Sequence, residues 1–176
     1  MKTLLNHKQL DITLQRLAHQ LIENHFDFSE TAIIGLQPRG VWLSDRIVSL
    51  LQYIMKQKAI HYGKLDITFY RDDVHQSGAM QTPSHTEINF SIEDKRVILI
   101  DDVLHTGRTI RSAMDALIDF GRPKTVELLV LIDRHYSREL PIQADYIGMV
   151  IDTIISQKVK VNWKEKDKKD EVLLID

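Results

Sequence analysis

Apolar residues recur along the chain at spacings that predict three helices. Over residues 10–22 they come every three or four positions, which places them on one face of a helix. The same spacing predicts a second helix over residues 40–55. A third is predicted over residues 107–120, because Gly121 and then Pro123 are the usual signals that end a helix.

Short apolar runs alternate with these helices. Strands are predicted at 31–36, 65–70, 97–100, 125–132 and 145–150. Strands that alternate with helices predict βαβ units, so the expected fold is α/β, a twisted and mainly parallel sheet with helices on both faces. Ligands collect at the carboxyl ends of strands in such sheets. The segments after Leu36, Ile100 and Ile132 are therefore where chemistry is expected.

Two stretches lie outside this alternation. Residues 72–93 are polar, and a loop longer than about 12–15 residues in a compact domain is usually functional, so a mobile active-site loop is expected there. Residues 149–176 are expected to form C-terminal strands. Within them, 159–163 and 172–175 are strand-like and flank the fully charged run 164–171, which predicts a hairpin.

Composition narrows the class of protein. The chain has 176 residues, 43% of them hydrophobic and 27% charged, which indicates one soluble globular domain over 1–176. A net charge of -2 disfavours a strongly basic nucleic-acid binder, and the absence of cysteine excludes thiolate chemistry. No apolar run reaches the roughly 20 residues of a membrane helix, and the first residues lack a signal-peptide pattern. A cytoplasmic protein without a membrane partner is expected.

The strongest site signal is the segment 97–109, which reads VILIDDVLHTGRT. Its apolar run ends in Asp101 and Asp102, whose carboxylates suit the two vicinal hydroxyls of a ribose. The turn that follows offers backbone N–H groups, hydroxyls and a helix N-terminus to an anion such as a 5′-phosphate. Gly107 lets the backbone approach closely. The segment therefore predicts a ribose 5-phosphate site; the ordinary alternative is a turn that caps a helix.

This segment matches the 5-phosphoribosyl-1-pyrophosphate (PRPP) motif of the type I phosphoribosyltransferases. Three further strings, at 67–73, 109–123 and 138–148, resemble the PyrR family of bifunctional pyrimidine operon regulators and uracil phosphoribosyltransferases. The resemblance covers nearly the whole chain. It implies a type I phosphoribosyltransferase fold, with a hood beside the sheet and a C-terminal hairpin.

Two other base specificities fit the sequence less well. In 6-oxopurine phosphoribosyltransferases an Asp usually stands where this chain has His105, and an imidazole with an unperturbed pKa near 6.5 is a different acid–base group. Orotate phosphoribosyltransferases carry a Lys on the mobile loop. Between Arg71 and Lys95 this chain has neither Lys nor Arg.

The resemblance implies an enzyme that converts uracil and PRPP into UMP and pyrophosphate with Mg²⁺. Asp101 and Asp102 would hold the ribose and contact Mg²⁺ indirectly, through water or substrate, and Arg39 is the third catalytic residue. The phosphate would lie in the turn of His105, Thr106, Gly107, Arg108 and Thr109.

The loop after the first predicted strand is expected to bind pyrophosphate. It consists of Gln37, Pro38, Arg39 and Gly40, and Arg39 would pair with the diphosphate by its forked geometry. The alternative is a surface turn that caps the next helix. A cis Gln37–Pro38 bond is conceivable, because proline lowers the cost of the cis form to about 0.5–1 kcal/mol.

Two further parts of the site follow from the resemblance. The mobile loop is expected to start at Arg71, Asp72 and Asp73, although Arg71 and Asp72 also fit a simple ion pair at a strand end. The base pocket is expected at the following residues: Asp133, Arg134 and Arg138. The segments 134–138 and 149–154 depart from the family pattern, which leaves uracil specificity open.

The alternative function is that of a UMP-sensing RNA-binding regulator that acts by transcription attenuation. Arg16 and His19 stand where the RNA-facing helix of the family has Arg and His; the ordinary alternative is two solvated surface residues. Basic residues of the family are replaced at Gln143 and Met149. We therefore expect weak or absent RNA binding. By analogy with the family, a homodimer or homotetramer is expected.

Overall fold

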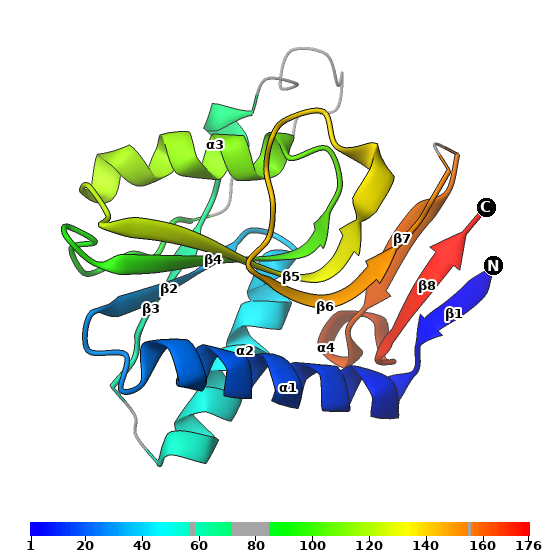
Figure 1. Cartoon of the computed structure of the whole chain (residues 1–176), viewed down its shortest axis with the longest axis horizontal. Helices are drawn as coiled ribbons and strands as arrows, with labels where there is room; N and C mark the ends of the chain where they lie inside the picture. Colours follow the sequence, from blue (N-terminus) through cyan, green and yellow to red (C-terminus); the bar gives the residue numbers. More distant parts are fainter. Residues whose placement is uncertain (57–58, 72–84, 155) are drawn as a thin grey trace.

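Two β-sheets organise the chain, shown in the computed structural model of Figure 1. The structure describes residues 1–56, 59–71, 85–154 and 156–176. The larger sheet is parallel throughout, with strand order β3-β2-β4-β5-β6. Its strands are β2 (Thr31–Leu36), β3 (His61–Leu65), β4 (Arg96–Leu104), β5 (Thr125–Arg134) and β6 (Tyr146–Ile151). The smaller sheet is antiparallel, with order β1-β8-β7.

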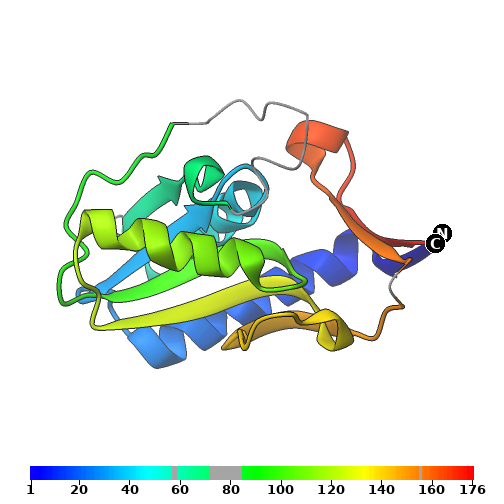
Figure 2. The ribbon, with the colours of Figure 1, turned by 90° about the horizontal axis from the view of Figure 1, so that it is seen from above.

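Helices cover both faces of the larger sheet, as Figures 1 and 2 show from two sides. On one face lie α1 (His7–His25) and α2 (Gly40–Met55), and on the other lies α3 (Arg108–Leu117). Neighbouring residues of a strand point to opposite faces. Accordingly Ile98 packs into the core beneath α1 and α2, while Leu99 packs into the core beneath α3. This arrangement confirms the predicted α/β class.

The helix over 40–55 is confirmed residue for residue, but the strand predicted over 65–70 is wrong. The strand β3 ends at Leu65, and Thr68–Tyr70 forms the 3₁₀ helix η1. The carboxylate of Asp66 accepts hydrogen bonds from the backbone N–H and the hydroxyl of Thr68, at 2.9 and 2.6 Å. Such a local turn competes with strand pairing and stops it. The third predicted helix is also divided, because η2 (Ile118–Phe120) follows α3.

The expected C-terminal hairpin is confirmed as β7 (Lys158–Asn162) and β8 (Glu171–Ile175), joined through the short helix α4 (Lys164–Asp167). The hydrophobic pattern does not reveal β1 (Lys2–Leu5), which pairs with β8 and brings the two termini together in Figure 1. We call β1, β7, α4 and β8 the hood. Among the described helices, none combines the length and apolar content needed to cross a membrane.

One arginine of α2 fastens the hood to the main body. Arg46 donates hydrogen bonds to Glu165 Oε2 and Asp170 Oδ1, each at 2.7 Å. Its guanidinium carbon lies 4.8 Å from the centroid of the buried Trp163 ring. A paired guanidinium over an aromatic face combines charge and stacking, so the hood is anchored at its base.

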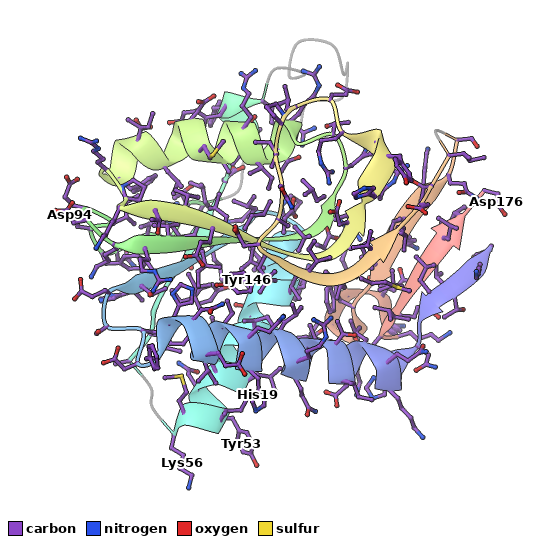
Figure 3. The ribbon with its side chains drawn as sticks, viewed as in Figure 1. His19, Tyr53, Lys56, Asp94, Tyr146 and Asp176 are labelled. Atoms are coloured by element: carbon purple, nitrogen blue, oxygen red, sulfur yellow. The ribbon has the colours of Figure 1, made fainter. Side chains whose placement is uncertain are left out.

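A buried polar network closes the opposite end of the sheet, where the strands begin. His25 lies 3.0 Å from Thr31 Oγ1 through Nδ1 and 3.0 Å from Glu127 Oε2 through Nε2. Tyr146, seen between the sheet and α1 in Figure 3, donates to the same Glu127 oxygen at 2.7 Å. Arg96 binds the other oxygen at 3.1 Å. Burial lowers the pKa of His25 below its ordinary value of 6.5.

This network makes stability depend on pH. The unfolded chain protonates His25 near pH 6.5, whereas the folded chain protonates it only at lower pH, so the free energy of unfolding should fall as the pH is lowered through the range around 6.5. The pKa of Glu127 is lowered from 4.5, so its contribution is lost only in a more acidic window. We expect His25→Gln to flatten the slope in urea titrations across that range. The exposed His61→Gln is the matched control, and an unchanged slope in His25→Gln would contradict the expectation.

Candidate active site

The predicted phosphate turn lines a cavity at the carboxyl end of β4. The cavity has a volume of about 210 Å³. It is lined by Arg71, Asp101, Val103, Leu104, His105, Thr106, Gly107, Arg108, Thr109, Ile110 and Ser112. All five residues of the predicted turn are therefore brought together with one of the two aspartates and with Arg71.

The shape of this turn depends on a glycine immediately before α3. Gly107 has a φ of +93°, a region that side-chain-bearing residues rarely adopt. A Cβ atom at this position would also lie 3.0 Å from Ile142 Cγ1. The turn is tightened by Thr106, whose hydroxyl accepts a hydrogen bond from the Arg108 N–H at 3.3 Å. The result is a close backbone approach at the start of a helix, where the helix dipole favours an anion.

The two aspartates at the end of β4 are both buried, with exposed fractions of 8% for Asp101 and 5% for Asp102. Asp101 Oδ1 accepts a hydrogen bond from the Asp102 backbone N–H at 2.8 Å. Burial, and then the adjacent charge of Asp102, raise the pKa of Asp101 well above its ordinary value. Asp101 therefore holds a proton more tightly than an exposed aspartate does.

Arg39 reaches across to the second aspartate. Its Nε lies 2.9 Å from Asp102 Oδ2, and its Nη2 donates to the backbone oxygen of Val161 in β7 at 2.7 Å. Arg39 is the N-cap residue of α2, although its side chain makes no capping hydrogen bond. The Gln37–Pro38 bond is cis, as the sequence allowed. The side-chain amide of Gln37 donates a hydrogen bond to the backbone oxygen of His85, at 2.5 Å.

Gly40 sits where α2 starts against the end of β4. A Cβ atom there would lie 2.5 Å from the Ile100 oxygen and 3.0 Å from the Asp101 Cα. The sequence places this glycine in the loop that is expected to bind pyrophosphate. The structure adds a packing requirement, because the loop 37–40 comes close to the two aspartates only if no side chain intervenes.

A second hollow, of about 410 Å³, lies beside the phosphate turn. Its lining residues are Asp133, His135, Arg138, Ile142, Gln143, Ile147 and Val150. Of the three residues expected in the base pocket, Asp133 and Arg138 are among them and Arg134 is not. Arg134 is buried and donates to Thr153 Oγ1 at 3.0 Å and to the Gln157 oxygen at 2.8 Å, so it ties β5 to the segment that leads into the hood.

The family assignment follows from comparison with known proteins. Residues 1–166 match the model of the phosphoribosyl transferase domain. A Bifunctional protein PyrR from Desulfosudis oleivorans is 47% identical over 165 residues, which are 94% of this chain and 91% of that protein. The chain belongs to the PyrR family of phosphoribosyl transferases. The resemblance read from its sequence is thereby confirmed.

Other comparisons agree with this membership. A Bifunctional protein PyrR from Deinococcus radiodurans is 44% identical over 174 residues, which are 99% of this chain and 94% of that protein. The solved hypoxanthine phosphoribosyltransferase of Trypanosoma cruzi superposes with a TM-score of 0.73, covering 99% of this chain and 95% of its own. At 14% identity that structure shows the shared fold alone.

The remaining predicted residues of this PyrR-family chain either line the 210 Å³ cavity or lie outside the described residues. His105 lines the cavity, and burial followed by the charge of Arg134 lowers its pKa below 6.5. Arg71 lines the same cavity. Asp72 and Asp73, with most of the expected mobile loop, lie outside the described residues.

The two residues expected to face RNA lie on α1, and both are exposed. Arg16 donates through Nη2 to the backbone oxygens of Gly148 at 2.6 Å and Ile147 at 3.2 Å, so it bridges α1 to β6. His19 is exposed on the side of α1 away from the sheet (Figure 3), with Nδ1 2.9 Å from the Gln15 oxygen. Their exposure agrees with the alternative of two solvated surface residues, and Arg16 in addition contacts β6.

Sequence reasoning missed two partners of the site. Glu139 accepts a hydrogen bond from Arg108 Nε at 2.8 Å, and Val161 receives Arg39 through its backbone oxygen. Because Glu139 is charged, the sequence alone could have suggested it as a partner for a nearby arginine. A backbone oxygen of a distant strand leaves no signal in the sequence.

The contact of Gly40 with β4 yields a stability prediction. Gly40→Ala should lower the free energy of unfolding by about 1–3 kcal/mol, because the new Cβ meets backbone atoms that have no rotamer to adopt. Urea denaturation followed by circular dichroism measures the change. An unfolding midpoint equal to that of the wild type would contradict the close approach.

Proposed function

We propose that the chain is a uracil phosphoribosyltransferase, which converts uracil and PRPP into UMP and pyrophosphate. One observation carries the proposal: the turn 105–109 and Asp101 line a single cavity at the start of a helix. A 5-phosphoribosyl group presents a phosphate and a vicinal diol, and a protein can recognise it by binding both at neighbouring points. Membership in the phosphoribosyl transferase family supports the reaction type.

The 5′-phosphate would lie against the turn of His105 to Thr109. Backbone N–H groups, the Thr106 and Thr109 hydroxyls and the positive end of the α3 dipole all favour a dianion there. The ribose hydroxyls would donate to Asp101 and Asp102, the acceptors that end β4. These contacts would position C1′ for the reaction.

Pyrophosphate would be bound by the loop 37–40. In the absence of ligand, the forked guanidinium of Arg39 binds Asp102. A diphosphate carries more charge than one carboxylate and offers the same paired oxygens, so it should replace Asp102 as the partner of Arg39. Asp102 is then released for the ribose. Binding of PRPP therefore exchanges one ion pair for two substrate contacts.

The residues present fit Mg²⁺ as the implied cofactor. Asp101 and Asp102 supply the hard oxygen donors that Mg²⁺ prefers, although Arg39 already occupies one Asp102 oxygen. Among the described residues no three metal-binding side chains cluster, which suits an ion held mainly by substrate oxygens and water. When bound, Mg²⁺ neutralises the charge that develops on pyrophosphate.

The reaction itself would need little covalent participation by the protein. A bond forms between uracil N1 and C1′ while the bond from C1′ to pyrophosphate breaks, and the proton of N1 is released to solvent. Positive charge develops on the ribose and negative charge on the leaving group, so the chain acts by positioning and electrostatics. The hollow beside the phosphate turn, lined by Asp133, Arg138 and others, is the candidate place for the base.

Asp102→Asn tests the proposed role of that carboxylate. The amide keeps the shape but loses the charge, so turnover should fall about 100-fold or more while the fold persists. Uracil-dependent pyrophosphate release with PRPP and Mg²⁺ is the assay, and circular dichroism checks the fold. Asp115→Asn, at an exposed position of α3, is the matched control and should keep full turnover.

Full activity of Asp102→Asn would show that this carboxylate has no such role. The same assay with hypoxanthine and orotate tests the choice of base. Turnover with either of them and not with uracil would overturn the uracil assignment while leaving phosphoribosyl transfer intact.

A second candidate function is UMP-dependent RNA binding, because the relatives carry the word bifunctional in their names. Arg16 is one of the two residues expected to face RNA. Its guanidinium donates hydrogen bonds to backbone oxygens of β6. Binding of RNA relies on free basic groups that neutralise phosphates. We therefore rank RNA binding below catalysis.

A gel-shift with a pyrimidine leader RNA, with and without UMP, measures the second function. We expect weak or no binding at physiological salt, because the chain is slightly acidic overall, with a net charge of -2. Tight binding that depends on UMP would contradict this expectation and establish the regulator alongside the enzyme.

A further inference from the structure

Arg138 occupies a central place between the two hollows, and its charged group is mostly covered, with 18% of the side chain exposed. We propose that Arg138 is a positioning residue that holds the phosphate turn in its binding shape. The inference rests on the proposed function, because it concerns how the same site holds the 5′-phosphate. It gives Arg138 a task different from reading the base or contacting RNA.

The contacts of Arg138 run to protein groups on two sides. One terminal nitrogen, Nη1, donates to the backbone oxygen of His105 in the phosphate turn. The other, Nη2, binds Oδ1 of Asp133, a buried carboxylate near the end of β5. A guanidinium presents its donors in a rigid fork, so it fixes the distance between these two acceptors.

The residues that follow Arg138 form hydrogen bonds to the next carbonyl of the turn. The backbone N–H groups of Glu139 and Leu140 both donate to the Thr106 oxygen, at 3.0 and 3.1 Å. Glu139 also binds Arg108 at 2.8 Å. The segment 138–140 therefore holds two consecutive carbonyl groups, those of His105 and Thr106.

Holding these carbonyls also orients the amides of the same peptide units. In a planar trans peptide the C=O and the N–H point in opposite directions. Because the His105 oxygen faces Arg138, the Thr106 N–H points away from it. Because the Thr106 oxygen faces Glu139 and Leu140, the Gly107 N–H points away from them.

These two amides are the donors that a phosphate needs. Within the described part of the chain, neither the Thr106 N–H nor the Gly107 N–H has a protein acceptor. Both residues line the 210 Å³ cavity. Asp133 balances the charge of Arg138, so the effect of Arg138 on the anion acts through the backbone that it holds.

The test is Arg138→Met, which keeps much of the side-chain volume and removes every donor. We expect the KM for PRPP to rise about tenfold or more, since small misplacements of binding groups have effects of this order. The KM for PRPP should change by a larger factor than the KM for uracil, because the held carbonyls belong to the phosphate turn. Arg122→Met, at an exposed position, is the matched control.

A binding measurement reports the same effect without turnover. In the wild type, ribose 5-phosphate should shift the backbone amide signal of Gly107 in a ¹H–¹⁵N spectrum, and Arg138→Met should weaken that response. Asp133→Asn serves as a second variant, since it leaves Arg138 in place with a neutral acceptor. Asp133→Asn should also raise the KM for PRPP, but by a smaller factor than Arg138→Met does.

The outcomes separate this inference from the proposed function. If the wild type neither binds ribose 5-phosphate nor transfers the phosphoribosyl group, the proposed function fails. If the wild type is active but Arg138→Met changes only the KM for uracil, or only RNA affinity, the positioning role is overturned. Should Arg138→Met fail to fold, Asp133→Asn decides: an unchanged KM for PRPP overturns the inference.

Discussion

The parallel pairing of β4 with both β2 and β5 is the constraint on which the candidate site depends. It aligns Gly35 with Ile100 and Leu104 with Asp133, so three loops leave the sheet at one edge. The loop 37–40, the segment 101–109 and the residues after Asp133 are far apart in the chain and adjacent in space. A shift of register by a single residue would move the side chain of Asp101, and that of Asp102, to the face opposite its present one and disrupt the site.

Arginine side chains connect the segments that meet at this edge of the sheet. Arg39 binds Asp102 and also reaches Val161, so the loop 37–40, the aspartate pair at the end of β4 and the hood share one side chain. Arg138 likewise joins the end of β5 to the phosphate turn. Each arginine thereby links two segments that are distant in the chain, which limits their freedom to move relative to one another.

The sequence foretold elements whose signal is local. The helix over 40–55 follows from the spacing of its apolar residues, and the strand Thr31–Leu36 follows from a short apolar run. The turn 105–109 can be recognised because its residues are contiguous. The strand expected over 65–70 failed because one side-chain hydrogen bond pattern at Asp66 outweighed β propensity. The strand β1 escaped notice because little of it is buried, and pairing with the distant β8 makes it a strand.

The chain by itself determined the α/β class, the order of its elements and a contiguous turn suited to a 5′-phosphate. These depend on periodicity and on backbone conformation within a few residues. Only the tertiary structure decided that Arg39 faces Asp102, that Arg134 turns toward the hood and that Arg138 braces the turn. An arginine can reach many partners, and its choice depends on which carboxylates and carbonyls packing leaves within reach. That proximity is a property of the assembled sheet, since no local stretch of sequence encodes it.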